Sequence, residues 1–188
     1  MSYKEFFIAA YEVLKLFVFS IVAMLILRNY LISPFFVKGA SMEPNFFENE
    51  YLIVDEITYR FQPEKRGDIV VFRYPQNQKE FFIKRLIGLP GEEVQIKDNN
   101  VTIFNEEHPE GFVLDEFYLG EGVSTVAANE ERIKVGANEI FVLGDNRNVS
   151  KDSRVFGPVN KSFLIGRVLF RGWPFSRVQV FSAPAYSY

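Results

Sequence analysis

Ser41 and Lys84 are the residues of this chain whose types best suit nucleophilic catalysis. A serine hydroxyl attacks a carbonyl group only when a neighbouring group removes its proton, and histidine is the usual base. The sequence contains one histidine, His108, in a polar stretch, and no cysteine. A lysine whose amine is kept neutral can act as the base instead. We therefore expect a dyad with Ser41 as the nucleophile and Lys84 as the base.

The sequence around each residue agrees with this pairing without requiring it. Ser41 follows Gly39 and precedes Pro44 by three positions, so small residues would let a substrate backbone approach, although ordinary turns look the same. Lys84 has apolar residues at positions 82, 83, 86 and 87. For its amine to be neutral at pH 7, burial would have to lower its pKa by about three units, at a cost of about 4 kcal/mol. The alternation of side chains along a strand equally allows Lys84 to face water. Lys84 and Arg85, however, must face opposite sides of a regular strand, so both cannot face solvent.

Residues 144–157 form a polar segment directly after an apolar run at 140–143. A solvated loop would explain the polarity. It would not explain why short hydrogen-bonding side chains and two combinations of Asp and Arg follow a strand end so closely. Such groups are suited to orienting a catalytic amine and to holding a loop through an ion pair.

Composition limits the possible functions. A chain of 188 residues can form one domain with a substantial core, and without cysteine it has neither disulfides nor cysteine-based zinc sites. The formal charge of −3 and the scattered basic residues argue against nucleic acid as a partner. The 21 phenylalanines are consistent with two arrangements: a surface that contacts lipid or apolar peptide, or a core rich in phenylalanine. No cofactor and no metal is expected.

The first 30 residues are predicted to form a membrane anchor. From Phe6 to Leu27, 19 of 22 residues are apolar, which is long enough to cross a bilayer as a helix. A cleavable signal peptide is the alternative, but Arg28 and not a small-residue cleavage site follows the run. Charges on the two sides of the run are balanced, so they do not give the orientation.

Beyond residue 40 the pattern favours β-structure. Short apolar segments separated by turn residues predict strands at 51–55, 68–73, 80–88, 93–97, 101–105, 132–135, 139–143 and 165–170. Turn residues at 98–100 and 136–138 predict two hairpins, and the acidic stretch 106–131 predicts a long loop. The expected fold is mainly β: an N-terminal transmembrane helix (1–30) followed by an antiparallel, partly closed β-sheet domain (31–188).

Together these segments resemble the bacterial type I signal peptidases, in particular the shorter Gram-positive enzymes. The resemblance covers almost the whole chain, and five motifs occur in the order of the family: Ser41 to Pro44, Gly67 to Phe72, Lys84 to Glu92, Gly144 to Gly157 and Ile165 to Arg167. It implies a membrane-bound serine endopeptidase that removes signal peptides from exported preproteins after small residues of the Ala-x-Ala type, with its catalytic domain on the extracytoplasmic side. Preprotein signal peptides and membrane lipid are the implied partners.

The resemblance also implies roles for individual residues. Ser41 would be the nucleophile, Lys84 the general base and Ser150 the hydroxyl that orients Lys84. The supporting residues would be Asp152, Arg154, Asp145 and Arg85, and those lining shallow substrate pockets would be Phe35, Val37, Met42, Phe82 and Ile83. The Ser41 backbone N–H would contribute to the oxyanion hole, and since Gly39 stands where other members place a serine, the second donor would be a backbone N–H or water.

Two other functions remain open from the sequence. The Ser/Lys fold is shared with self-cleaving repressor-type regulators, although the N-terminal segment here is apolar and not a DNA-binding domain. A catalytically silent membrane-anchored β module that binds exported chains is the other alternative, but it would be expected to lack Ser41 or Lys84. A protease dependent on His108 is disfavoured because nothing around that residue resembles a catalytic triad.

Overall fold

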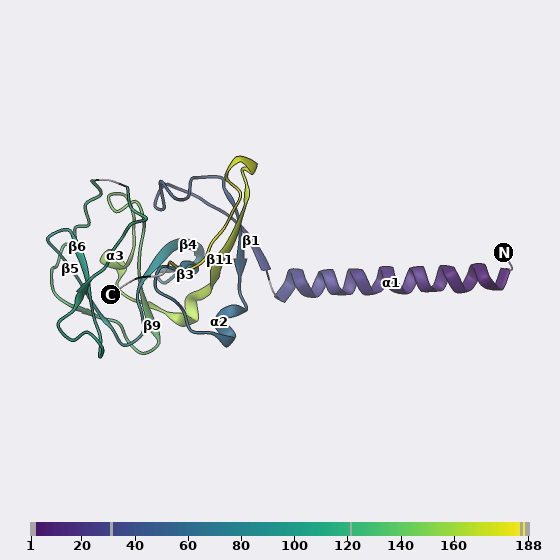
Figure 1. Cartoon of the computed structure of the whole chain (residues 1–188), viewed down its shortest axis with the longest axis horizontal. Helices are drawn as coiled ribbons and strands as arrows, with labels where there is room; N and C mark the ends of the chain where they lie inside the picture. Colours follow the sequence, from purple (N-terminus) through teal and green to yellow (C-terminus); the bar gives the residue numbers. More distant parts are fainter. Residues whose placement is uncertain (1–2, 31, 121, 185, 187–188) are drawn as a thin grey trace.

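The computed structural model describes residues 3–30, 32–120, 122–184 and 186; for 23–30 and 32 it describes the backbone alone. The first element is α1 (Tyr3–Tyr30), which projects away from the β-structure that follows (Figure 1). Within the described residues, no helix combines the length and apolar composition of a membrane span. The membrane anchor stays a prediction.

The larger sheet holds the strands around the predicted site. Among the described residues it has eight antiparallel strands in the order β1-β2-β11-β3-β4-β9-β10, with β12 paired to β11. Their bounds are β1 Ile32–Phe36, β2 Tyr51–Asp55, β3 Ile69–Tyr74, β4 Asn77–Gly88, β9 Glu139–Leu143, β10 Val159–Asn160, β11 Leu164–Trp173 and β12 Gln179–Val180. The order places β4 in the interior of the sheet, between β3 and β9.

A second sheet has four described strands in the order β7-β6-β5-β8. Their bounds are β5 Glu93–Lys97, β6 Asn100–Phe104, β7 Phe112–Val113 and β8 Ile133–Lys134. One core cluster joins the two sheets, because Phe141 and Leu143 of β9 pack with Val94 and Ile103. Short helical turns complete the fold: α2 Thr58–Phe61, α3 Ser153–Phe156, η1 Lys161–Phe163 and η2 Phe175–Arg177.

Most of the predicted strands are confirmed. Those at 51–55, 93–97 and 139–143 have the observed bounds, and the others overlap the observed strands with ends shifted by up to three residues. The turn at Asp98 and Asn99 joins β5 to β6, with both residues at positive φ. The predicted long loop 106–131 contains the two-residue strand β7, and β1 was missed because Pro34 interrupts its pattern.

The hairpin predicted at 136–138 is wrong. The strands on either side of it, β8 and β9, belong to different sheets: β8 pairs with β5, whereas β9 pairs with β4 and β10. The backbone of Val135 bonds to Gly91 and Glu92, which draws this end of β8 toward β5. Residues 136–138 therefore form a crossover between sheets, a distinction that turn chemistry alone does not make.

Candidate active site

Ser41 lies in the segment between β1 and β2, which buried residues on both sides hold against the core. Met42 and Phe46 are fully buried, and the Phe46 amide donates to the Met42 carbonyl at 2.8 Å. On the opposite side, the Ser41 carbonyl accepts a hydrogen bond from the Asn146 amide at 3.1 Å. The backbone around Ser41 is thus fixed to both the core and the 144–157 segment.

Lys84 stands where β4 enters the interior. The residues before Phe82 in this strand are exposed and those from Lys84 onward are buried. Lys84 pairs with Val70 of β3 and is only 3% exposed. Its Nζ lies 2.7 Å from Ser41 Oγ and donates to the Ile83 carbonyl at 2.9 Å. The fold therefore brings the two residues, 43 positions apart in sequence, into hydrogen-bond contact.

The surroundings of Lys84 raise the fraction of its amine that is neutral. Burial lowers the pKa of Lys84 from 10.5 to about 8, while the charges of Asp152 and Asp145 act in the opposite direction. Within the described chain, no carboxylate lies at ion-pair distance from its amine, and the Phe82 ring centroid is 5.2 Å away. About one lysine in ten is then neutral at pH 7, which supplies a base for the adjacent hydroxyl.

Arg85 points to the other side of β4 and is paired. Its Nε and Nη2 donate to the two carboxylate oxygens of Asp145 at 2.8 and 2.6 Å, and its guanidinium lies 3.8 Å from the Tyr118 ring centroid. Burial alone would disfavour the charge, but the hydrogen bonds and the charge of Asp145 outweigh it and raise the pKa of Arg85. This pair joins β4 to the segment after β9.

Ser150 lies beside Ser41 because position 144 is a glycine. A Cβ on Gly144 would come within 2.1 Å of Ser150 Oγ and 2.5 Å of the Ser41 carbonyl oxygen, so any side chain would force these segments apart. Ser150 Oγ is buried and makes no hydrogen bond to any described residue. A buried hydroxyl without a partner costs about 1–3 kcal/mol, a cost more typical of functional sites than of ordinary loops.

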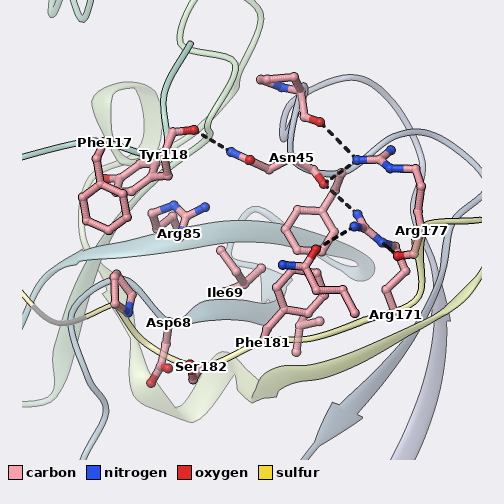
Figure 2. A pocket seen from close by; sticks show the side chains of 15 residues that line it. Asn45, Asp68, Ile69, Arg85, Phe117, Tyr118, Arg171, Arg177, Phe181 and Ser182 are labelled. Carbon is pink, nitrogen blue, oxygen red and sulfur yellow. Dashed lines mark hydrogen bonds between the residues drawn. The ribbon is translucent and has the colours of Figure 1, made fainter.

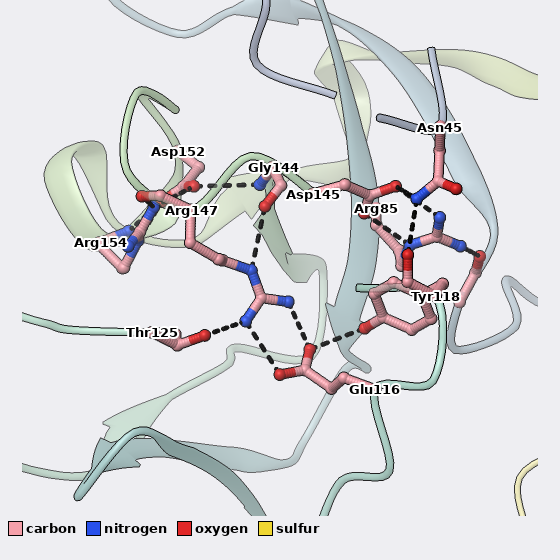
Figure 3. A network of polar contacts seen from close by, with 11 residues as sticks. Asn45, Arg85, Glu116, Tyr118, Thr125, Gly144, Asp145, Arg147, Asp152 and Arg154 are labelled. Carbon is pink, nitrogen blue, oxygen red and sulfur yellow. Dashed lines mark hydrogen bonds and ion pairs between the residues drawn. The ribbon is translucent and has the colours of Figure 1, made fainter. Parts of the chain in front are cut away.

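Asp152 and Arg154 form a buried ion pair that shapes the 144–157 segment (Figure 3). Arg154 donates to both oxygens of Asp152 at 2.9 Å, and the Gly144 amide donates to one of them at 3.0 Å. Arg154 also donates to the Arg147 carbonyl at 2.7 Å. The pair thus closes the segment into a loop against the end of β9.

The structure adds residues that the sequence did not single out (Figure 3). Arg147 is buried and binds Glu116, Thr125 and the carbonyl of Gly144. Asn45 donates to Asp145 at 2.8 Å and to the Tyr118 carbonyl at 2.9 Å. Glu116, Tyr118 and Thr125 come from the acidic stretch that lacks a clear period, so only the contacts identify them.

Two arginines bind the backbone of the segment after Ser41 (Figure 2). Arg171 donates to the Asn45 carbonyl at 2.7 Å, and Arg177 donates to the Asn45 and Pro44 carbonyls at 3.2 and 3.3 Å. Both also pair with the buried Glu50. Arg171 and Arg177 also line a second cavity of about 260 Å³, together with Pro44, Asn45 and Phe46. Glu50 thereby anchors the segment that carries Ser41 through two charged side chains.

A cavity of about 680 Å³ opens next to the Ser41 and Lys84 side chains. Four of the five predicted substrate-binding residues line it: Phe35, Val37, Phe82 and Ile83. Met42 does not, because its side chain is 1% exposed and packs into the core with Phe46. The lining is mainly apolar, as expected for a site that binds small uncharged side chains.

His108 is placed away from this cavity. Its ring packs edge-on against Phe112 of β7 in the second sheet, at a centroid distance of 5.1 Å, and it is not among the cavity's lining residues. In the part of the chain that the structure describes, no group of three or more His, Asp or Glu side chains is arranged to hold a metal ion.

Comparisons with known proteins identify the family of this chain. The family described as signal peptidase, peptidase S26, matches residues 10–173. The chain is 36% identical over 172 residues to a probable signal peptidase I-2 of Synechocystis sp. (89% of this chain, 75% of the relative) and 31% identical over 166 residues to signal peptidase IB of Staphylococcus aureus (82% and 85%). A crystal structure of a signal peptidase I from Enterococcus faecalis V583 aligns with 56% of this chain and 97% of that chain, at 32% identity and a TM-score of 0.46. By the family match and the two sequence relatives, the chain belongs to the signal peptidase family of serine peptidases, the S26 peptidases.

Proposed function

We propose that this protein is a membrane-anchored serine endopeptidase that removes signal peptides from preproteins after small residues, with Ser41 and Lys84 as its catalytic dyad. The single observation that carries the proposal is the 2.7 Å contact between Lys84 Nζ and Ser41 Oγ, inside a buried site that lowers the pKa of the lysine. Membership of the signal peptidase family supplies the substrate class.

The proposed reaction is acyl transfer in two halves. The neutral amine of Lys84 takes the hydroxyl proton while Ser41 Oγ attacks the scissile carbonyl carbon. The resulting ammonium then gives that proton to the leaving amine as the C–N bond breaks, which leaves an ester on Ser41. In the second half Lys84 removes a proton from water, the hydroxide attacks the ester, and the proton returns to Ser41 Oγ as the C–O bond breaks.

Residues around the dyad would stabilise and orient it. The Ser41 N–H is the proposed donor to the oxyanion, and a backbone N–H or water would be the second donor beside Gly39. The unpartnered hydroxyl of Ser150 is the proposed group that orients the Lys84 amine. The pairs of Asp152 with Arg154 and of Asp145 with Arg85 would hold the 144–157 segment and β4 in position.

An extended substrate can bind along β4. Residues 77–84 of this strand pair with β3 on one edge, whereas the β9 pairing on the other edge begins only at Arg85. In the described chain this leaves a strand edge beside Ser41, and such an edge recruits an extended peptide through main-chain hydrogen bonds. Side chains of that peptide would enter the apolar cavity, where Phe35, Val37 and Ile83 favour small residues.

We also infer that residues 1–30 anchor the protein as a single-pass segment, with residues 31–188 as the extracytoplasmic catalytic domain. The described apolar side chains of α1 are exposed all round the helix, a pattern that suits lipid and not water. Lys15 and Glu12, the charges within the apolar run, pair with each other at 3.1 Å. The expected result of deleting residues 1–30 is residual cleavage that depends strongly on detergent or lipid, and full activity without either would refute the anchor.

The central test uses a preprotein with an Ala-x-Ala site and the detergent-solubilised protein, with product ends read by mass spectrometry. We expect the wild type to cut after the second Ala and both Ser41→Ala and Lys84→Ala to be inactive, while His108→Ala, a matched change outside the cavity, keeps full activity. Cleavage that survives either dyad change would refute the dyad. A folded wild type that binds preproteins without cutting them would instead favour the silent binding module.

A further inference from the structure

The cavity beside Ser41 carries more positive charge than the rest of the protein. Its charged lining residues, apart from Lys84, are Lys38, Lys79 and Lys151 against a single Glu80. The whole chain has the opposite balance, with 21 Lys and Arg against 24 Asp and Glu. All three lysines are exposed, and within the described residues none of them forms an ion pair. Their charge is therefore available to a ligand in the cavity.

Lys151 is held in place by aromatic rings. Its ammonium lies 4.6 Å from the ring centroid of Tyr74, and Tyr74 stacks on Phe82 at a centroid distance of 4.5 Å and an angle of 10°. Phe82 in turn contacts the amine of Lys84. A cation over an aromatic face is attracted by the ring quadrupole, so Lys151 has a preferred position at the same wall as the dyad.

The positive charge is concentrated at the end of the cavity that holds the dyad. Lys79 and Glu80 are neighbours on β4, about 15 Å along the strand from Lys84, and their charges offset each other. Lys38 precedes Ser41 by three residues, and Lys151 directly follows Ser150, whose hydroxyl lies beside the Ser41 segment. Near the scissile bond the lining thus contributes two exposed cations, and neither forms an ion pair with a described residue.

We propose that Lys38 and Lys151 make this cavity select substrates with an acidic side chain within two residues of the cut. The inference rests on the proposed function and deepens it, from small residues alone to small residues flanked by a carboxylate. The same cations would attract phosphate groups of anionic lipid. A peptide carboxylate is favoured because the lysines line the cavity that contains the nucleophile, so their charge stands at a fixed place relative to the bond being cut.

The test measures kcat/KM for one preprotein with an Ala-x-Ala site, in which Glu, Gln or Lys occupies the middle position or either of the first two positions after the cut. With the full-length protein in detergent at low salt, we expect Glu to exceed Lys by about five- to tenfold at one or more positions. Because exposed charges are screened, about 0.5 M salt should reduce this ratio to about two or below. Lys151→Glu should invert the ratio, and Lys38→Glu should lower it.

The matched control is Lys97→Glu, which makes the same charge change on an exposed residue of β5 in the second sheet and should leave the ratio unchanged. Equal kcat/KM for the Glu and Lys substrates in the wild type would overturn the proposal. It would also be overturned if Lys97→Glu changed this ratio as much as Lys151→Glu does. If Lys151→Glu does not fold, Lys151→Gln provides the same test, with an expected ratio near one. If the Lys38 and Lys151 variants differ from the wild type only in binding phosphatidylglycerol vesicles, and not in the ratio of kcat/KM for Glu and Lys, the lysines bind lipid and the proposal is overturned. A wild type that cuts none of the substrates would refute the proposed function itself.

Discussion

Lys84 and Arg85 are adjacent cations on β4, nearly equally buried, and they have opposite surroundings. Arg85 is 7% exposed and shares two hydrogen bonds with Asp145, and its pKa is raised. Lys84 is 3% exposed and has the Ser41 hydroxyl and a carbonyl as its described hydrogen-bond partners, and its pKa is lowered. Alternation along a strand sends neighbours to opposite faces, so one strand supplies both environments.

The difference shows how one strand can separate stability from chemistry. A buried cation with a well-placed carboxylate stays charged and ties two segments together. A buried cation without one loses part of its charge and becomes a base. The sequence of β4 contains both cations, but only the contacts from the 144–157 segment decide which is paired.

The largest expected effect is on activity, from Lys84→Met. Removing the base should lower kcat/KM for the preprotein by about 10⁴-fold or more. The same change should raise the free energy of unfolding at pH 7 on the order of 2 kcal/mol, because a buried ammonium is replaced by an apolar side chain of similar size. Thermal unfolding in detergent and the cleavage assay check the two parts, and a variant that is both inactive and less stable would contradict the comparison.

The second effect is on stability, from Asp145→Asn. The change leaves the Arg85 guanidinium buried without its carboxylate, and we expect the free energy of unfolding to fall by about 4 kcal/mol. Glu93→Gln is the matched control, since it removes a half-exposed partner of Arg132 at 3.7 Å and should cost no more than about 0.5 kcal/mol. Similar losses for the two variants would show that the buried pair has no special role.

The third effect is on the pH dependence of cleavage. Because Lys84 acts as a base only when neutral and its pKa is about 8, kcat/KM should rise about tenfold per pH unit up to pH 7 and level off above pH 8.

The free energy of unfolding should also depend on pH, in the direction expected for a lysine whose pKa is lowered in the folded state. Between about pH 8 and 10.5 the unfolded chain holds a proton that the folded chain lacks, so Lys84 contributes increasing stability as pH rises. Arg85 stays charged over this range and should not make the free energy of unfolding depend on pH. If kcat/KM is constant from pH 6 to 9, Lys84 is excluded as the base.

The smallest effect is expected from Asn45→Ala. Asn45 joins the Ser41 segment to Asp145 through one hydrogen bond, so its loss should cost about 1 kcal/mol of stability and lower kcat several-fold with KM little changed. Steady-state kinetics check this. A higher KM with unchanged kcat would mean that Asn45 acts in substrate binding and does not couple the Ser41 segment to Asp145.

Much of the fold could be predicted from the sequence because its signals are local. Alternating apolar residues fix strands such as β2, β5 and β9, and the turn residues at 98 and 99 fix one hairpin. Which sheet a strand joins depends on distant partners, so the crossover after β8 could not be predicted from its turn residues.

The candidate site divides in the same way. Ser41, Lys84 and the Asp152–Arg154 pair stand in recognisable segments, and the structure brings Ser41 and Lys84 into contact. Glu116 and Tyr118 lie in a stretch without period, and Asn45 looks like any turn residue, so their contacts arise only from the fold. The family resemblance implies that Met42 lines the substrate pocket, but in the structure it lies in the core.

The join between α1 and the sheet is short: β1 begins at Ile32, two positions after α1 ends at Tyr30, and Ser41 follows Tyr30 by eleven positions. Even fully extended, eleven residues span at most about 40 Å. With α1 in a bilayer, as proposed, the nucleophile can lie no more than about 40 Å above the membrane surface. The protein would then cut a bound chain only where a suitable residue lies within that distance of the membrane. Identical sequences elsewhere along an exported protein would not be cut.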